Sequence, residues 1–534
     1  MDVVDISRWQ FGITTVYHFI LVPLTIGLAP MIAIMQTVWV KTGNEAWLRA
    51  TKFFAKLFLI NFALGVATGI VQEFQFGMNW SQYSRFVADV FGAPLAMEGL
   101  VAFFLESTFL GLWFFGWKRL SKGVHLACIW LVAIGVTASA YFIIAANSFM
   151  QHPVGVEWNE TLQRPQMTSI WQVLTNNTTM LAFPHVILGA WLTAATVVAV
   201  VCLYWMARNS VRAKQLAAGS APVTTAPSQL GASSEQLMDE NRNLWRPVAL
   251  FALWMTVFSG IGLFITGDAQ GQLMFKQQPM KMAAAESLCK TETGAGFSVL
   301  SIGTQNNCAH INHLIVIPNM LSFLSDHTFD SRVQGVEELQ AQYEAEFAKA
   351  REEGRLSRMV AESSAFPAGQ NFAPNLFVTY WSFRAMITWA LGSVVVALGG
   401  LFLLRKKRPG GGLEVSRKAA VVGLWMLPTP FLANASGWIF TEMGRQPWVV
   451  VPNWANPEEA DPFKISMLVK DGVSFNGTGL VWTSLIIFTL LYAALGVVWF
   501  MLERRYVREG PAAAEDPDAE TPDESESDKL SFAY

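Results

Sequence analysis

Charged side chains are scarce in this sequence of 534 residues. Asp, Glu, Lys and Arg make up 14% of the chain, whereas an average soluble domain contains about a quarter. The formal net charge is only −3, which gives no reason to expect a nucleic-acid partner. Hydrophobic residues, in contrast, make up 52% of the chain. This composition excludes an ordinary soluble domain and indicates a membrane protein.

Cysteine and histidine are also scarce, with 4 and 7 residues. Cys128 and Cys202 lie in apolar runs, where we expect inert core residues. So few histidines argue against a copper centre with several imidazole ligands. The N-terminus "MDVVDISRWQFG" lacks the basic region and cleavage site of a signal peptide, so we interpret it as the start of a polytopic protein.

Long apolar runs dominate what is present. A run of about 20 apolar residues is long enough to cross a membrane as a helix. The runs lie near residues 12–40, 52–76, 93–117, 124–147, 179–207, 246–267, 376–404, 418–441 and 479–503. The predicted fold class is therefore all-α, a polytopic membrane protein with about nine transmembrane helices.

The charges of the connecting segments predict the orientation. Alternate segments are basic, for example around Lys41, Lys118, Arg405 and Arg504, and the segments between them are neutral or acidic. Because Lys and Arg are enriched in cytoplasmic loops, we expect the N-terminus outside and the C-terminus in the cytoplasm.

The same pattern divides the chain into four parts. They are residues 1–267 with six helices and a cytoplasmic linker at 208–245, an extracytoplasmic loop at 268–375, residues 376–508 with three helices, and an acidic tail at 509–534. Segment 213–240 and the tail have compositions that cannot bury enough apolar surface, so we expect both to be disordered. In the outer loop, "GVEELQAQYEAEFAKAREEGRLSRMV" predicts a charged helix.

The outer loop also contains Cys289 and Cys308. An extracytoplasmic loop lies in an oxidising compartment, so this location predicts a disulfide between them. Two free thiols are the alternative.

Several ionisable residues lie within the apolar runs. A charge at the middle of a bilayer costs at least ~2.5–3.5 kcal/mol on insertion scales, so each is a candidate functional residue. In the expected orientation they lie on separate helices in the outer half of the membrane, with one carboxylate about two turns deeper. The candidates are His18, Glu98, the deeper Glu106, His185, Arg384, Glu442 and Arg445.

Imidazoles, a thioether and carboxylates in one layer are typical ligands of haem iron. A His/Met pair gives a low-spin haem with a raised potential, and His185 with Met386 can form such a pair. A single His or a carboxylate leaves an iron position open to a small ligand, which suits His18 and Glu442.

Two arginines in this layer, Arg384 and Arg445, would neutralise haem propionates. Simpler interpretations exist for the separate residues: Met386 is an ordinary core residue, and Glu442 pairs with Arg445 one turn away. Spacing alone leaves two function classes open, a haem protein and a transporter with a polar pathway.

The strings around these residues decide between the two classes. They are "SRWQFGITTVYHFILVPLTIGL", "FGAPLAMEGLVAFFLESTFLGLW", "FPHVILGAW", "GDAQGQLMFKQQPMKMAAAESL", "YWSFRAMI" and "GWIFTEMGRQPW". Together they resemble subunit I of the cytochrome bd quinol oxidases, from about residue 5 to about residue 505. The expanded loop at 213–240 and the cysteine pair depart from the general pattern of that family.

The resemblance implies three cofactors, a low-spin haem b, a high-spin haem b and a haem d. His185 and Met386 would be the axial ligands of the low-spin haem. His18 and Glu442 would be ligands of the two high-spin haems, in an order that the sequence leaves open.

The resemblance also implies a proton path. Glu98 would lie beside the high-spin haems. Glu106, Ser107 and Ser139 would belong to a path that rises from the cytoplasm.

The remaining implied roles concern quinol and the haem edges. Lys281 and Glu286 would bind or deprotonate quinol. Arg384 and Arg445 would hold haem propionates, and Trp438 would lie between haems.

The function implied is a terminal oxidase of the bacterial cytoplasmic membrane. It would oxidise quinol outside, reduce dioxygen to water with cytoplasmic protons, and generate a proton-motive force without pumping. The partners implied are subunit II and, as an optional third component, a small single-helix subunit. The alternatives are a b-type cytochrome that only passes electrons and a haem-free transporter.

Overall fold

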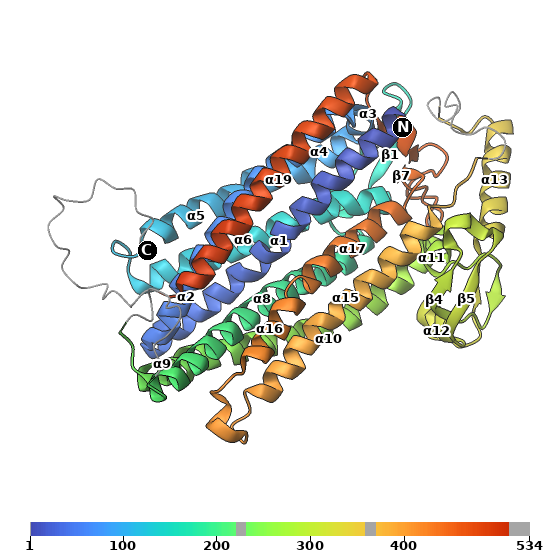
Figure 1. The fold of residues 1–534 in the computed structure, drawn as a ribbon. Helices are drawn as coiled ribbons and strands as arrows, with labels where there is room; N and C mark the ends of the chain where they lie inside the picture. Colours follow the sequence, from blue (N-terminus) through green and yellow to red (C-terminus); the bar gives the residue numbers. More distant parts are fainter. Residues whose placement is uncertain (1, 220–230, 358–369, 512–534) are drawn as a thin grey trace.

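The computed structural model describes residues 2–219, 231–357 and 370–511. Long helices lie along one another in an elongated bundle, and short strands and helices gather at one end (Figure 1). Within the described residues, nine helical segments are long and apolar enough to span a membrane. They are Val3–Thr42, Glu45–Met78, Ala88–Phe115, Lys122–Gln151, Ile170–Ala217, Ser234–Gln277, Leu376–Leu403, Arg417–Gly444 and Thr478–Glu509. The predicted all-α, polytopic fold is confirmed.

Several of these segments consist of more than one helix. The helices of the first half are α1 (Val3–Thr42), α2 (Glu45–Met78), α3 (Ser81–Phe86), α4 (Ala88–Met97), the π-helix η1 (Glu98–Phe103), α5 (Phe104–Phe115), α6 (Lys122–Gln151), α7 (Ile170–Leu174), α8 (Asn177–Ala217), α9 (Ser234–Glu240), the π-helix η3 (Asn241–Trp245) and α10 (Arg246–Gln277). The helices of the second half are α11 (Pro279–Glu286), the 3₁₀-helix η4 (Thr304–Ala309), α12 (Met320–Asp326), α13 (Val336–Glu352), α15 (Leu376–Leu403), the 3₁₀-helix η5 (Pro409–Gly412), α16 (Arg417–Met426), α17 (Thr429–Gly444), α18 (Val469–Gly472) and α19 (Thr478–Glu509).

Local sequence signals set several helix ends. Gly43 ends α1 in the left-handed conformation, and the Asn44 side chain then caps α2 by accepting from Ala46 N. Ser121 caps α6, and Asn375 caps α15. Such oxygens satisfy backbone N–H groups that have no partner in the first turn.

Small residues bring the helices of the bundle close together. A Cβ at Gly27 of α1 would lie 2.3 Å from the carbonyl oxygen of Ala190 on α8, so a larger residue there would separate these helices. Near the opposite end of α8, the indole of Trp205 stacks on that of Trp245, with ring centroids 5.6 Å apart. The core is therefore continuous along α8.

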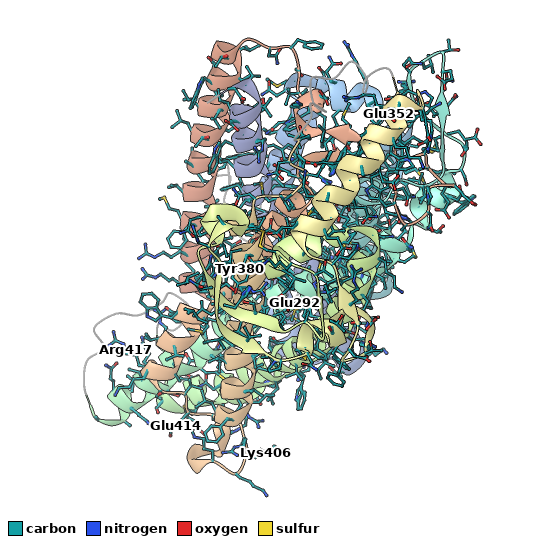
Figure 2. The ribbon with its side chains drawn as sticks, turned by 90° about the vertical axis from the view of Figure 1, so that its right-hand side faces the viewer. Glu292, Glu352, Tyr380, Lys406, Glu414 and Arg417 are labelled. Carbon is teal, nitrogen blue, oxygen red and sulfur yellow. A yellow bond between two sulfur atoms is a disulfide. The ribbon has the colours of Figure 1, made fainter. Side chains whose placement is uncertain are left out.

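The predicted outer loop is a folded region. Strands β4 (Phe297–Ile302) and β5 (Asn312–Ile317) form an antiparallel hairpin, and β3 (Glu292–Thr293) pairs with β6 (Arg332–Val333). The predicted charged helix is present as α13. This region covers one end of the bundle, with Glu292 and Tyr380 near its centre and Lys406, Glu414 and Arg417 towards the opposite end (Figure 2).

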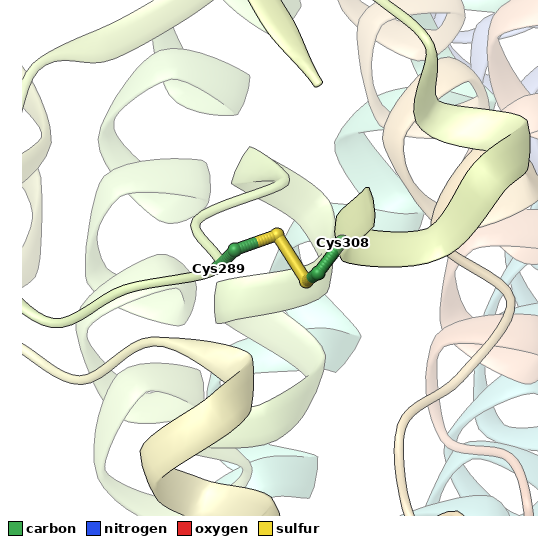
Figure 3. Close-up of a disulfide and its surroundings, with 2 residues drawn as sticks. All are labelled: Cys289 and Cys308. Carbon is green, nitrogen blue, oxygen red and sulfur yellow. A yellow bond between two sulfur atoms is a disulfide. The ribbon is translucent and has the colours of Figure 1, made fainter. Parts of the chain in front are cut away.

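A disulfide joins the start of this region to the 3₁₀-helix η4. Cys289, which follows α11, is bonded to Cys308, with the Cα atoms 5.6 Å apart (Figure 3). Cys128 and Cys202 are free and buried.

Two further hairpins lie at the same end of the bundle as the start of α1. They pair β1 (Val156–Asn159) with β2 (Arg164–Met167), and β7 (Trp448–Val450) with β8 (Met467–Leu468). The start of α1 and the outer region share this end, and α9 lies at the other (Figure 1). The assignment of these ends to the two sides of a membrane stays a prediction.

The prediction of disorder across 213–240 was wrong at both ends. Helix α8 continues to Ala217, and α9 begins at Ser234. Ser233 and Gln236 form a reciprocal capping box that stabilises the start of α9. Residues 220–230 and the tail from residue 512 lie outside the described residues.

Candidate functional site

Two histidines on different helices have matching surroundings. Nδ1 of His18 on α1 lies 2.8 Å from Oγ1 of Thr68 on α2. Nδ1 of His185 on α8 lies 3.0 Å from Oγ1 of Thr266 on α10. Within the described residues no hydrogen bond reaches Nε2 of either ring, so each offers one nitrogen to a further ligand.

Met386 lies on α15, which packs against α8, α10 and α17. A Cβ at Gly437 of α17 would lie 3.0 Å from the Met386 sulfur, so this glycine makes room for the thioether. Asn434, one turn before Gly437, donates to the Thr193 hydroxyl of α8 at 2.9 Å. The elements that carry His185 and Met386 are therefore packed together.

Glu442, near the end of α17, is held through both carboxylate oxygens. Asn147 Nδ2 donates to its Oε1 at 2.9 Å, and Arg445 donates to its Oε2. Arg445 is buried, yet its Nε and Nη1 have no hydrogen-bond partner among the described residues. A buried guanidinium whose N–H donors have no partner lowers the stability of the fold. These donors therefore indicate that an anionic group binds beside Arg445.

A cavity of about 110 Å³ lies beside these groups, between α1, α2 and α17. Its lining includes Glu442, Arg445, Trp80, Tyr83 and Trp438. Trp80 Nε1 and Tyr83 Oη are buried and also lack partners in the described part of the chain. Several residues that line this space therefore carry polar atoms without a hydrogen-bond partner among the described residues.

Trp438 connects this cavity to the first histidine. Its ring stacks on Phe19, with centroids 4.4 Å apart and an interplanar angle of 24°. Phe19 follows His18 directly in α1. The position of Trp438 between haems, and its role there, stay predictions.

Glu98 is the first residue of the π-helix η1, and Ser139 Oγ on α6 donates to its Oε1 at 2.7 Å. π-Helical turns are frequent at functional sites. Glu106 lies in the next helix, α5. Its side chain is buried, and its Oε1 has no hydrogen-bond partner among the described residues. A Cβ at Gly135 of α6 would meet the Glu106 side chain at 2.7 Å, so this glycine allows the carboxyl to approach α6.

Ser107 differs from its predicted companions. It is exposed on α5, and its hydroxyl donates to Phe103 O at 2.8 Å. The structure thus connects Glu98 with Ser139, and in the described part of the chain no hydrogen bond joins the side chains of Ser107 and Glu106. Its place in a proton path stays a prediction.

Lys281 on α11 points towards the end of α17. Its ammonium lies 3.4 Å from Thr441 O and 3.4 Å from Gln151 Oε1. Burial, together with the nearby positive charge of Arg445, lowers the pKa of Lys281 to about 7, although Glu442 opposes the shift. Lys281 can therefore hold or release a proton near neutral pH.

Glu286, at the end of α11, forms a buried ion pair with Arg384 of α15. Nη2 lies 2.6 Å from Oε2. The other donors of Arg384 are directed to the carbonyl oxygens of Ala285 and Ser298. A role of Arg384 towards a haem propionate stays a prediction, and it would require the guanidinium to share these donors.

Sequence reasoning missed several residues of this site. Thr68, Thr266 and Asn147 look like ordinary polar residues of apolar helices, and only the packing of separate helices reveals their partners. Glu73, on α2, is close enough to Glu98 to interact with it electrostatically. Its position within an apolar run was a signal that could have found it.

Comparison with known proteins identifies the family. The sequence profile of the family described as "Cytochrome bd terminal oxidase subunit I" matches residues 6–511. The chain belongs to this family. The assignment confirms the predicted resemblance and the predicted enzyme class, a quinol oxidase of the respiratory chain.

Individual relatives agree with the cytochrome bd assignment. The chain is 37% identical to the cytochrome bd ubiquinol oxidase subunit 1 of Bacillus subtilis, covering 96% of this chain and 94% of the relative. It is 33% identical to the cytochrome bd-II ubiquinol oxidase subunit 1 of Escherichia coli, covering 96% and 98%. The bd oxidase structure from Geobacillus thermodenitrificans shares the fold, with a TM-score of 0.69 and 22% identity over 96% of this chain and 99% of that one.

Members of the cytochrome bd family hold haem, and the residues of this chain fit such a group. Two imidazoles each present an Nε2 that has no hydrogen bond within the described ranges, and a thioether lies beside a glycine. The unpaired N–H groups of Arg445 beside the cavity suit a propionate carboxylate. This donor set matches the axial ligands and propionate partners that haem requires.

Proposed function

We propose that this chain carries the haem groups of an oxidase that takes electrons from quinol at its outer end and reduces dioxygen to water. One observation carries the proposal. The two candidate quinol residues of α11 contact the two helices that carry candidate iron ligands: Lys281 lies against α17, which carries Glu442, and Glu286 is paired with α15, which carries Met386. Quinol oxidation and haem ligation would thus share one end of the bundle.

At the quinol end, two buried groups are suited to proton transfer. Lys281, with its pKa near 7, would accept a proton from a quinol hydroxyl when neutral. Glu286 is buried with Arg384 and would orient the other hydroxyl as a hydrogen-bond acceptor. Protons released here would leave on the outer side.

His185 and Met386 would hold the low-spin haem b. His18 and Glu442 would hold the high-spin haem b and haem d, in an order that we leave open. When bound, these groups supply electron transfer and a position for dioxygen. Arg445 would pair with a propionate through its unpartnered N–H groups, and Trp438 would fill the space between α1 and α17.

Protons for water formation would come from the cytoplasmic side. Glu106, buried and unpaired in the described part of the chain, would receive them, and Glu98 with Ser139 would pass them outward. Ser107 would act nearer the entrance. Because protons are released outside and consumed from inside, electron transfer would separate charge without a pump.

The chain would act in the bacterial cytoplasmic membrane, with its N-terminus outside, together with subunit II. A small single-helix subunit would complete some assemblies. The exposed apolar side chains along α10 and α19 support burial of the bundle in lipid or against such partners. They include Trp254, Phe258, Phe264, Ile486 and Leu490.

Purified complex in liposomes tests this function. With quinol as donor, we expect oxygen uptake, acidification on the side of α11 and alkalinisation of the opposite side, with no additional protons translocated. Electron transfer to an artificial acceptor without oxygen uptake would favour a b-type cytochrome. A preparation without haem would favour a transporter.

A further inference from the structure

The two candidate histidine ligands are each hydrogen-bonded to a threonine whose hydroxyl makes a second contact. Thr68 Oγ1 lies 2.9 Å from Gly65 O of its own helix, and Thr266 Oγ1 lies 2.9 Å from Gly262 O. The hydroxyl of each threonine therefore lies between a backbone carbonyl and Nδ1 of a histidine on a neighbouring helix.

The number of protons determines the direction of these bonds. A hydroxyl carries one proton, and a carbonyl oxygen can only accept. The threonine proton is therefore directed to the carbonyl, and the hydroxyl oxygen accepts from the imidazole. Nδ1 is then the protonated nitrogen of the neutral ring, and the lone pair is left on Nε2.

A glycine follows each of these threonines and leaves space that the same ring occupies. A Cβ at Gly69 would lie 3.2 Å from Cε1 of His18, and a Cβ at Gly267 would lie 3.3 Å from Cε1 of His185. Carbon atoms in contact are usually ~3.5–4.0 Å apart, so a side chain at either position would press on Cε1, the ring carbon bonded to both nitrogens. The same Thr-Gly pair thus occurs at two separate sites.

We propose that Thr68 and Thr266 are positioning residues that hold His18 and His185 in the Nδ1–H tautomer, so that each presents the lone pair of Nε2 to a haem iron. The inference rests on the proposed function, because it assumes that these histidines are ligands. The acceptor is a neutral hydroxyl, so it fixes the ring without adding a charge inside the membrane. Gly69 and Gly267 leave room for Cε1 of the two rings.

Thr266 offers the sharper test, because the low-spin haem has its own optical band. Thr266→Val removes the hydroxyl and keeps the branched shape, and Thr266→Ser restores the hydroxyl. In the intact complex we expect Thr266→Val to shift the midpoint potential of the low-spin haem. We also expect the variant to bind haem ~10–100-fold more weakly when apomyoglobin is added as a competitor for haem. This is the usual effect of removing a partner of a metal-bound histidine. Thr266→Ser should restore both values.

A matched control lies on the same helix. Thr256 of α10 is buried and donates to Ala252 O at 3.0 Å, and no imidazole of the described residues is hydrogen-bonded to it. Thr256→Val removes the same kind of hydroxyl and should leave the potential and the haem retention unchanged. For Thr68 of α2, the corresponding control is Thr51, which donates to Trp47 O at 2.8 Å. Thr68→Val should alter a high-spin signal and spare the low-spin one.

Two outcomes separate the inference from the function on which it rests. If His185→Ala removes the low-spin signal and Thr266→Val behaves like Thr256→Val, the positioning role is overturned and the ligand assignment stands. If His185→Ala keeps the low-spin signal, the ligand assignment itself fails. A changed potential in Thr266→Val with recovery in Thr266→Ser supports the proposal.

Discussion

Glu286 and Arg384 form an ion pair that is almost completely buried, with side-chain exposures of 2% and 9%. The pair joins α11 of the outer region to α15, the helix that carries Met386. A hydrogen bond of 2.6 Å therefore connects the candidate quinol site to the helix that carries a candidate iron ligand.

Removing one partner of this ion pair should lower the unfolding free energy. Glu286→Ala leaves the Arg384 guanidinium buried without its counter-ion, which typically costs ~3–5 kcal/mol of unfolding free energy. Glu286→Gln keeps the shape and should retain the fold while slowing quinol oxidation. Thermal unfolding and oxygen uptake with quinol would measure the two effects.

The control for this pair is Glu338, whose carboxylate is bonded to Arg332 on the surface of the same region. Glu338→Gln should change stability and activity far less, since that pair is solvent-exposed. An equal loss of electron transfer from quinol and from an artificial donor in Glu286→Gln would argue against a quinol role.

The pKa of Lys281 predicts a pH dependence of stability. Burial and the nearby charge of Arg445 lower the pKa of Lys281 from 10.5 to about 7. Between about pH 7 and 10.5 the unfolded chain binds one proton more than the folded chain, so this group makes the unfolding free energy rise with pH in that window. Lys281→Met should therefore stabilise the protein most at or below pH 7, and the gain should shrink as pH rises. Unfolding midpoints measured from pH 6 to 9 would show a constant difference if Lys281 kept an ordinary pKa.

Met386→Leu should convert the low-spin haem to a high-spin form or release it, because leucine has no atom that can ligate iron. The optical spectrum of the reduced complex measures this change. Met206 of α8 is buried in the core and serves as the control, so Met206→Leu should leave the spectrum intact. An unchanged low-spin band in Met386→Leu would mean that another residue is the ligand.

Glu106→Gln should slow oxygen reduction by at least ~10²-fold, because an amide cannot carry the proton that a carboxyl transfers. The low-spin spectrum should be unaffected. Glu45, exposed in the first turn of α2, provides a control, and Glu45→Gln should keep full activity. Full oxygen uptake in Glu106→Gln would remove Glu106 from the proton path.

The disulfide should stabilise the outer region. Cys289 and Cys308 are 19 residues apart, and a loop of this size corresponds to ~3 kcal/mol in the chain-entropy description. The double variant Cys289→Ser/Cys308→Ser should unfold at a lower temperature, and its unfolding should no longer respond to reductant. A reductant effect of the same size in that variant would assign the response to another part of the complex.

The sequence predicted the helices well because a membrane helix is encoded locally, by a continuous apolar run. It also drew attention to His18, His185 and Glu442 as candidates, since polar residues in such runs are conspicuous. The partners of these residues were not predictable in the same way. Thr68, Thr266 and Asn147 meet their histidines or carboxylate only through the rotation and register of separate helices, which hydrophobic pattern does not specify.

The pairing of Arg384 with Glu286 was missed for the same reason. Its two residues are 98 positions apart, and the β4–β5 hairpin lies between them in the sequence. The start of α9 was missed because a polar, capped helix has a composition close to that of a disordered linker. The π-helix at Glu98 depends on a local change of hydrogen bonding that composition does not reveal.

The most direct test of the central claim is the dithionite-reduced minus air-oxidised spectrum of the purified complex, with pyridine extraction of its haems. The account predicts one low-spin b-type signal, one high-spin b-type signal and a chlorin-type band from haem d. A preparation that contains only b-type haem, or none, would contradict it.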